Sequence, residues 1–71
     1  MTKSEIGAAI FEEIKAHVEK QGYGMSNLQF PESYPVSRRT CYHIKAGRWT
    51  PELLAKLPFK VTVNYKIEFH T

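Results

Sequence analysis

The sequence predicts a small, mainly helical domain of three to four helices, followed by a C-terminal β-strand that pairs across a homodimer. Three observations lead to this fold class: apolar residues at helical spacing in residues 3–21, a short basic segment with helix start and stop signals at residues 37–46, and strict alternation of apolar and polar residues in residues 59–70. A chain of 71 residues has room for one domain. We therefore treat residues 1–71 as one domain, with a helical part in residues 1–58 and a strand in residues 59–70.

The first predicted helix has a clear beginning, an apolar face and an end. Thr2 and Glu5 match the capping-box pattern, in which each side chain accepts a hydrogen bond from the other residue's backbone N–H. Gly22 and Gly24 follow the apolar stripe and end the helix. The apolar face, which we expect to form the core scaffold, consists of residues four apart: Ile6, Ile10, Ile14 and Val18.

Residues 25–35 lack a helical pattern. Pro31 and Pro35 each disfavour a helical conformation at the residue before them, and proline is tolerated only in the first turn of a helix. We expect a short turn followed by an irregular loop. Phe30 and Tyr34 are expected to pack against the first helix.

The basic segment that follows is typical of a short helix. Ser37 suits the N-cap, and Gly47 suits the position just past the end, where a left-handed conformation is common. Val36, Cys41 and Ile44 form one apolar seam. The side chains left to point outward are Arg38, Arg39, Tyr42, His43 and Lys45.

A further helix is predicted after the basic segment. Thr50 suits its N-cap, Pro51 its first position, and Pro58 ends it. The inner face consists of Leu53, Leu54 and Leu57. Trp49, between the two helices, could stack on a partner, but packing between helices is the expected role.

The charge of the chain is divided unevenly along its length. The net charge is +3, to which residues 1–32 contribute −2 and residues 33–71 contribute +5, and no acid occurs between Ser33 and Pro51. A one-sided basic patch attracts phosphate backbones. A basic helix anchored by few core residues suits the major groove of DNA, while a solvated surface helix is the alternative that this segment leaves open.

Residues 59–70, in which apolar and polar residues alternate, are predicted to form a strand that has no partner strand in its own chain. Eleven residues of strand would run roughly 36 Å, and no other segment resembles a strand. A lone strand leaves unpaired backbone groups, so we expect it to pair with the same strand of a second copy about a two-fold axis. A tail that folds back on its own helices is the alternative. The expected dimerisation residues are Val61, Val63, Tyr65, Ile67 and Phe69.

Residues 25–47 resemble the lambda-repressor-like, Cro-type helix-turn-helix domains of phage and bacterial regulators. The residues that carry the resemblance are Met25 and Ser26 at the start, Val36 and Ser37 at the turn exit, Thr40, Cys41 and Ile44 at inner positions, and Gly47 at the end, with no gap in the spacing. Two residues depart from the pattern: Pro31 stands where the family usually has alanine, and Pro35 where it usually has glycine.

The resemblance implies sequence-specific binding of double-stranded DNA by a dimeric transcriptional repressor, with a recognition helix at about residues 37–46. It places Arg39 and Tyr42 where the family reads bases, and Arg38, Lys45 and Arg48 near phosphates. The C-terminal strand is similar to that of some toxin–antitoxin repressors. The expected partners are therefore double-stranded DNA, a second copy of the chain, and a toxin or other protein. The implied DNA-binding residues are Ser37, Arg38, Arg39, Tyr42, His43, Lys45 and Arg48.

The alternative function is a protein-interaction module on the same scaffold, without DNA binding, whose strand adds to another protein's sheet. We do not expect an enzyme, because the chain has no aspartate, no glycine-rich phosphate loop and no pair of acids beside a histidine. Cys41 and His43 do not share a helix face, so we expect no metal and no cofactor. No apolar run approaches the roughly 20 residues that span a bilayer, and no signal-peptide pattern is present, so we expect a soluble, cytoplasmic protein.

Overall fold

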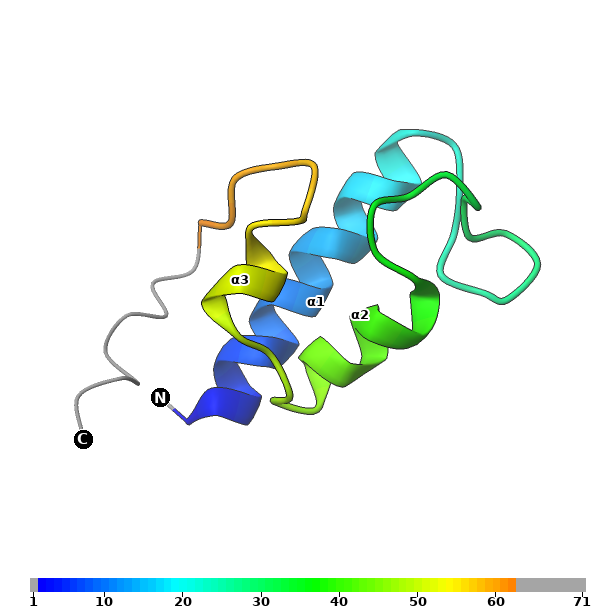
Figure 1. The fold of residues 1–71 in the computed structure, drawn as a ribbon. Helices are drawn as coiled ribbons and strands as arrows, with labels where there is room; N and C mark the ends of the chain where they lie inside the picture. Colours follow the sequence, from blue (N-terminus) through cyan, green and yellow to red (C-terminus); the bar gives the residue numbers. More distant parts are fainter. Residues whose placement is uncertain (1, 63–71) are drawn as a thin grey trace.

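The computed structural model describes residues 2–62, and within them the chain forms three α-helices joined by turns and loops. These are α1 (Lys3–Lys20), α2 (Arg38–Lys45) and α3 (Pro51–Leu54) (Figure 1). The predicted mainly helical class is therefore confirmed. Residues 2–62 contain no β-strand and no helix long and apolar enough to cross a membrane. Most of the predicted strand, residues 63–70, lies outside the described residues.

The beginning of α1 is the predicted capping box. The Thr2 hydroxyl accepts a hydrogen bond from the Glu5 N–H at 3.1 Å, and the Glu5 carboxylate accepts one from the Thr2 N–H at 2.8 Å. The bond from the Thr2 backbone holds the pKa of Glu5 below its usual value. The helix ends at Lys20, and Gly22 follows with a φ of +88°, a left-handed conformation that glycine adopts without strain.

The apolar stripe of α1 forms one side of a single core. Its four predicted members are buried, which confirms the scaffold role of the helix. The other side of the core comes from the later part of the chain. Its buried members are Met25, Val36, Cys41, Ile44, Trp49, Leu54 and Leu57.

The connection from α1 to α2 consists of turns and loop, as predicted from Pro31 and Pro35. Tyr34 packs against α1, because its hydroxyl lies 3.0 Å from the Nδ1 atom of His17, and the Phe30 ring contacts the Tyr34 ring at 5.3 Å between centroids. The His17 ring therefore has a hydrogen-bond partner within the chain. The second helix of a helix-turn-helix pattern is not formed in this connection.

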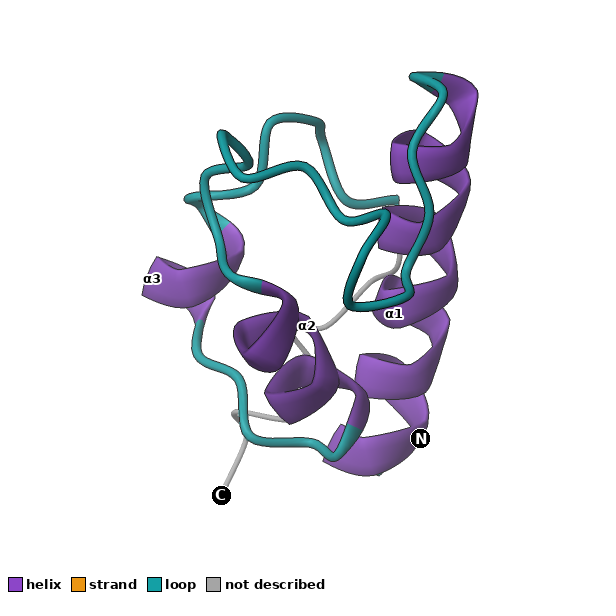
Figure 2. Cartoon of the chain, turned by 90° about the vertical axis from the view of Figure 1, so that its right-hand side faces the viewer, coloured by secondary structure: helices purple, strands orange, loops and turns teal. Residues whose placement is uncertain are grey.

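α2 begins and ends at the predicted signals. The Ser37 hydroxyl caps the helix by accepting the Thr40 N–H at 3.1 Å, and Gly47 follows the helix with a φ of +91°. Cys41 and Ile44 are buried and face α1, which lies beside α2 in the core (Figure 2).

The backbones of α1 and α2 approach closely at Gly7. A Cβ atom at Gly7 would overlap the carbonyl oxygen of Ile44 and lie 3.2 Å from Cδ1 of Trp49. One turn along the crossing, a Cβ atom at Gly47 would lie 2.8 Å from the Ser4 hydroxyl. Only glycine leaves room for α2 to lie at this depth on α1.

α3 is shorter than predicted. Thr50 caps it by accepting the Leu53 N–H at 3.1 Å, but the helix ends at Leu54 rather than continuing to Pro58. The N–H groups of Lys56 and Leu57 bond to carbonyls three residues back, so the chain tightens into turns before the proline. Leu57 is still buried, as predicted.

Residues 59–62 lie along α1. The Phe59 ring stands 4.9 Å from the His17 ring between centroids, and the Thr62 N–H donates to the Glu13 carboxylate at 3.1 Å. Val61, one of the predicted dimerisation residues, is half-buried and packs against the core of its own chain. The other predicted dimerisation residues lie outside the described residues: Val63, Tyr65, Ile67 and Phe69.

Replacing Gly7 by alanine tests the close approach of the two helices. At an unconstrained helix position this change would stabilise the fold by about 1 kcal/mol. Here the added methyl group meets the Ile44 carbonyl, so we expect the free energy of unfolding to fall by about 1–3 kcal/mol. Urea denaturation followed by circular dichroism measures this, with the exposed Ala8→Ser as the control. A Gly7→Ala variant as stable as the parent would contradict the packing.

Candidate nucleic-acid interface

The side of α2 opposite the core is positively charged and open to solvent. Because Cys41 and Ile44 point inward, the helical repeat turns Arg39, Tyr42 and His43 outward. Arg39 is exposed and makes no hydrogen bond, ion pair or ring contact with any other residue in the described part of the chain. Its guanidinium group, with five N–H donors, is therefore available to a ligand.

Tyr42 stands between two cations on the flank of α2 that faces α1. Its ring is 39% exposed and contacts the ring of Phe11 at 5.0 Å between centroids. The Arg38 guanidinium carbon lies 4.9 Å from the Tyr42 centroid, and the Lys45 Nζ lies 5.9 Å from it and 4.9 Å from that of Phe11. These cation–π contacts hold two positive charges beside the phenol on the surface.

Arg38 also has a structural role that was not predicted. Its Nε–H donates a hydrogen bond to the carbonyl oxygen of Met25, which lies in the connection between α1 and α2. The first turn of α2 is thereby tied to the start of the loop. The Arg38 side chain, which was predicted to contact phosphate, is thus engaged with the loop beside α2.

Arg48, in the segment just after α2, lies beside His43 in the last turn of the helix. Arg48 is exposed, and its Nη1 lies 3.4 Å from Nδ1 of His43. Because arginine can only donate, Arg48 is the donor in this contact. At the other end of the helix, the Ser37 hydroxyl is used in capping and also lies 2.9 Å from the Thr40 hydroxyl.

Trp49 is part of the core and does not form a stacking platform. It is buried, and its Nε1–H donates to the carbonyl oxygen of Lys3 at 2.9 Å. The Lys3 Nζ lies 5.3 Å from the centroid of the same ring system. Trp49 thus links the segment after α2 to the start of α1, as expected for a residue that packs between helices.

Cys41 is buried beneath the basic face. Burial raises the pKa of its thiol to about 11, so the thiol is uncharged at neutral pH and behaves as a small apolar residue, as expected. Burial likewise raises the pKa of the Tyr34 hydroxyl to about 12. In residues 2–62, no group of three or more His, Cys, Asp or Glu side chains gathers at one place.

The structure brings six of the seven predicted DNA-binding side chains to α2 itself or to its N-cap, and Arg48 to the segment just after it. Sequence reasoning missed the residues that support them: Phe11 under Tyr42, and Met25 behind Arg38. Phe11 flanks the apolar stripe of α1, so its position gave a weak signal.

Comparisons of the chain with protein-family models, with curated proteins and with solved structures find no match.

The two adjacent arginines of α2 have different expected effects on stability. Arg38→Ala removes the bond to the Met25 carbonyl and the contact with Tyr42, so we expect a loss of about 1–3 kcal/mol in the free energy of unfolding. Arg39→Ala is the matched control and should change it by less than about 0.5 kcal/mol. Urea denaturation of the two variants measures the difference. Equal stability of both variants would show that the Arg38 bond does not order the loop.

Proposed function

We propose that the chain binds double-stranded DNA through the outer face of α2 and acts as a dimeric transcriptional repressor of the Cro-type helix-turn-helix kind. The observation that carries the proposal is the charge of this face. Arg39 and Arg48 are exposed, Arg38 and Lys45 flank Tyr42, and the sequence has no acid between Ser33 and Pro51. Such a face supplies the electrostatic attraction on which binding to phosphate backbones depends.

The size and anchoring of α2 suit the major groove. An α-helix with its side chains is about 10–12 Å in diameter, which fits a major groove about 12 Å wide. The eight residues of α2 supply about 12 Å of helix to lie in that groove. The inner side of α2 is fixed by buried Cys41 and Ile44, and its backbone rests on Gly7. A helix held in this way fixes the backbone positions from which its outer side chains extend, which base recognition requires.

In this proposal the side chains of α2 divide between bases and phosphates. Arg39, which is exposed and makes no hydrogen bond, ion pair or ring contact within residues 2–62, reads a base, most simply the N7 and O6 acceptors of guanine, and Tyr42 and His43 lie beside it. The cations at the margins hold phosphates, which gives affinity without choice of sequence. They are Arg38, Lys45 and Arg48, with the helix N-terminus at Ser37.

The loop between α1 and α2 takes over the supporting role that the second helix has in the family. Met25 and Val36, near the two ends of the loop, are buried in the core, and the Arg38 bond joins the loop to α2. This support is consistent with a recognition role for α2 despite Pro31 and Pro35. The charged face of α2 supports DNA binding more strongly than the family resemblance does.

A protein-interaction module without DNA binding is the second candidate function. The loop favours it, because Leu28 is 96% exposed and Tyr23 is 49% exposed, so the surface that replaces the second helix is apolar in part. The salt dependence of binding separates the two functions. Duplex binding weakens steeply as salt rises, whereas an apolar protein contact changes little.

Binding to a duplex selected from a random pool tests the proposed roles. Arg39→Ala should lower the preference for the selected site over a single-base variant by about 1–3 kcal/mol, or roughly 5- to 150-fold. Arg48→Ala should weaken binding to both duplexes equally and reduce the slope of log K against log salt by about 1. Fluorescence anisotropy measures both quantities.

Lys56→Ala is the matched control, because it removes the same charge outside α2 and should leave site preference unchanged. If the parent protein retains no duplex at low salt, DNA binding is wrong. If Arg39→Ala keeps the full site preference, DNA binding stands but the assignment of Arg39 to a base does not.

A further inference from the structure

The turn that ends α2 holds His43 and Arg48 against each other. Gly47 adopts a left-handed conformation, and its N–H bonds to the Ile44 carbonyl at 2.9 Å. The Arg48 N–H bonds to the His43 carbonyl, also at 2.9 Å. These two bonds form the Schellman motif, which ends many helices. The Arg48 side chain returns to the same residue, with Nη1 at 3.4 Å from Nδ1 of His43, so both backbone and side chain join the pair.

The side chains around His43 are positively charged. Arg39 precedes it by four residues, so the two lie one turn apart on the same face of α2. In the described part of the chain, Arg48 is the one residue that forms a hydrogen bond, ion pair or ring contact with the His43 side chain. α1 packs against the side of α2 that carries Cys41 and Ile44, so His43 faces away from it. The charged side chains that the described structure places toward His43 are therefore Arg39 and Arg48.

Protonation of His43 changes what this pair offers to a ligand. Histidine is the side chain whose charge ordinarily changes between about pH 5 and 8. A neutral imidazole accepts a hydrogen bond from an arginine, whereas a protonated one donates from both ring nitrogens and accepts none. A charged His43 therefore gives up its role as acceptor toward Arg48. It becomes a third cation on the outer face of α2, between Arg39 and Arg48.

We propose that His43 makes the affinity of the chain for double-stranded DNA depend on pH, because its ring takes up a proton when the outer face of α2 meets phosphates. This dependence rests on the proposed function of α2 in DNA binding. The proton adds one positive charge to the face and leaves both Arg48 and His43 able to donate to phosphate oxygens. Their partners in the complex are then phosphates in place of each other.

The direction of the pH dependence follows from the charges on each side. In the free chain, a charged His43 meets two like charges, whereas in the complex it also meets the opposite charge of the phosphates. DNA therefore favours the charged form, and by linkage the charged form favours DNA. The affinity rises as the pH falls through the range in which histidine titrates, and it levels off once the ring is charged in the free chain as well.

Fluorescence anisotropy of the full chain with a random-sequence duplex, at about pH 8 and about pH 5.5, tests the proposal. At about 0.1 M salt the parent should bind roughly 5- to 10-fold more tightly at the lower pH. The slope of log K against log salt should steepen by up to about 0.9, since one more phosphate is neutralised. Calorimetry in two buffers of different ionisation enthalpy should show proton uptake on binding.

Three variants assign the effect to His43. His43→Gln cannot be charged and should bind at both pH values as the parent does at about pH 8, whereas His43→Lys stays charged and should bind at both as the parent does at about pH 5.5. His17→Gln is the matched control on α1, where His17 is bonded to Tyr34, and it should keep the full pH dependence. Circular dichroism of each variant checks that its fold is that of the parent.

The outcomes separate this inference from the proposed function. A parent that retains no duplex at either pH overturns DNA binding, and the role of His43 falls with it. A parent that binds duplex equally at the two pH values, or a His43→Gln variant with the same pH dependence as the parent, overturns the role of His43 alone.

Discussion

The close approach of α2 to α1 at Gly7 is the constraint on which the rest of the structure depends. With no side chain at Gly7, the carbonyl of Ile44 lies against the α1 backbone, and Ile44 and Cys41 reach the apolar stripe of α1. Gly47 against Ser4 and the Trp49 bond to the Lys3 carbonyl extend the same crossing. An eight-residue helix is marginal alone, so its stability and its orientation come from this contact.

Much of the fold could be predicted because its signals are local. The caps at Thr2, Ser37 and Thr50, and the two prolines of the loop, act within a few residues of themselves, and each has its predicted effect. The closeness of the helices at Gly7 could not be predicted, because it depends on which distant segment meets that glycine. For the same reason the Arg38 bond to Met25 was missed: Arg38 was expected to point outward, but it is half-buried and bonded to the loop.

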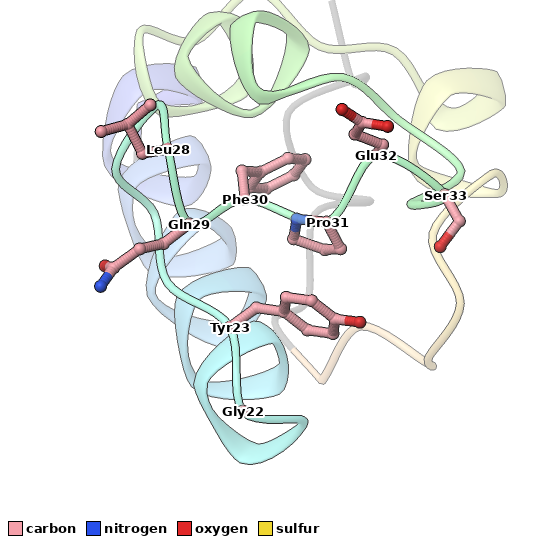
Figure 3. A pocket seen from close by; sticks show the side chains of 8 residues that line it. All are labelled: Gly22, Tyr23, Leu28, Gln29, Phe30, Pro31, Glu32 and Ser33. Carbon is pink, nitrogen blue, oxygen red and sulfur yellow. The ribbon is translucent and has the colours of Figure 1, made fainter.

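Supporting and exposed groups are separated along α2. Arg38 lies over the ring of Tyr42 and Lys45 over that of Phe11, so the two cations help to join the helices. Arg39 makes no hydrogen bond, ion pair or ring contact within residues 2–62. The loop between α1 and α2 is joined to α2 by the Arg38 bond and exposes Leu28 to solvent (Figure 3).

The central claim is that the outer face of α2 is the surface that meets nucleic acid. Titration of the isotopically labelled chain with a random-sequence duplex at low salt, followed through backbone amide chemical shifts, tests it most directly. The account predicts that the largest shifts fall in residues 37–48 and disappear as salt is raised. Shifts confined to the loop around Leu28, or no shifts at all, would contradict it.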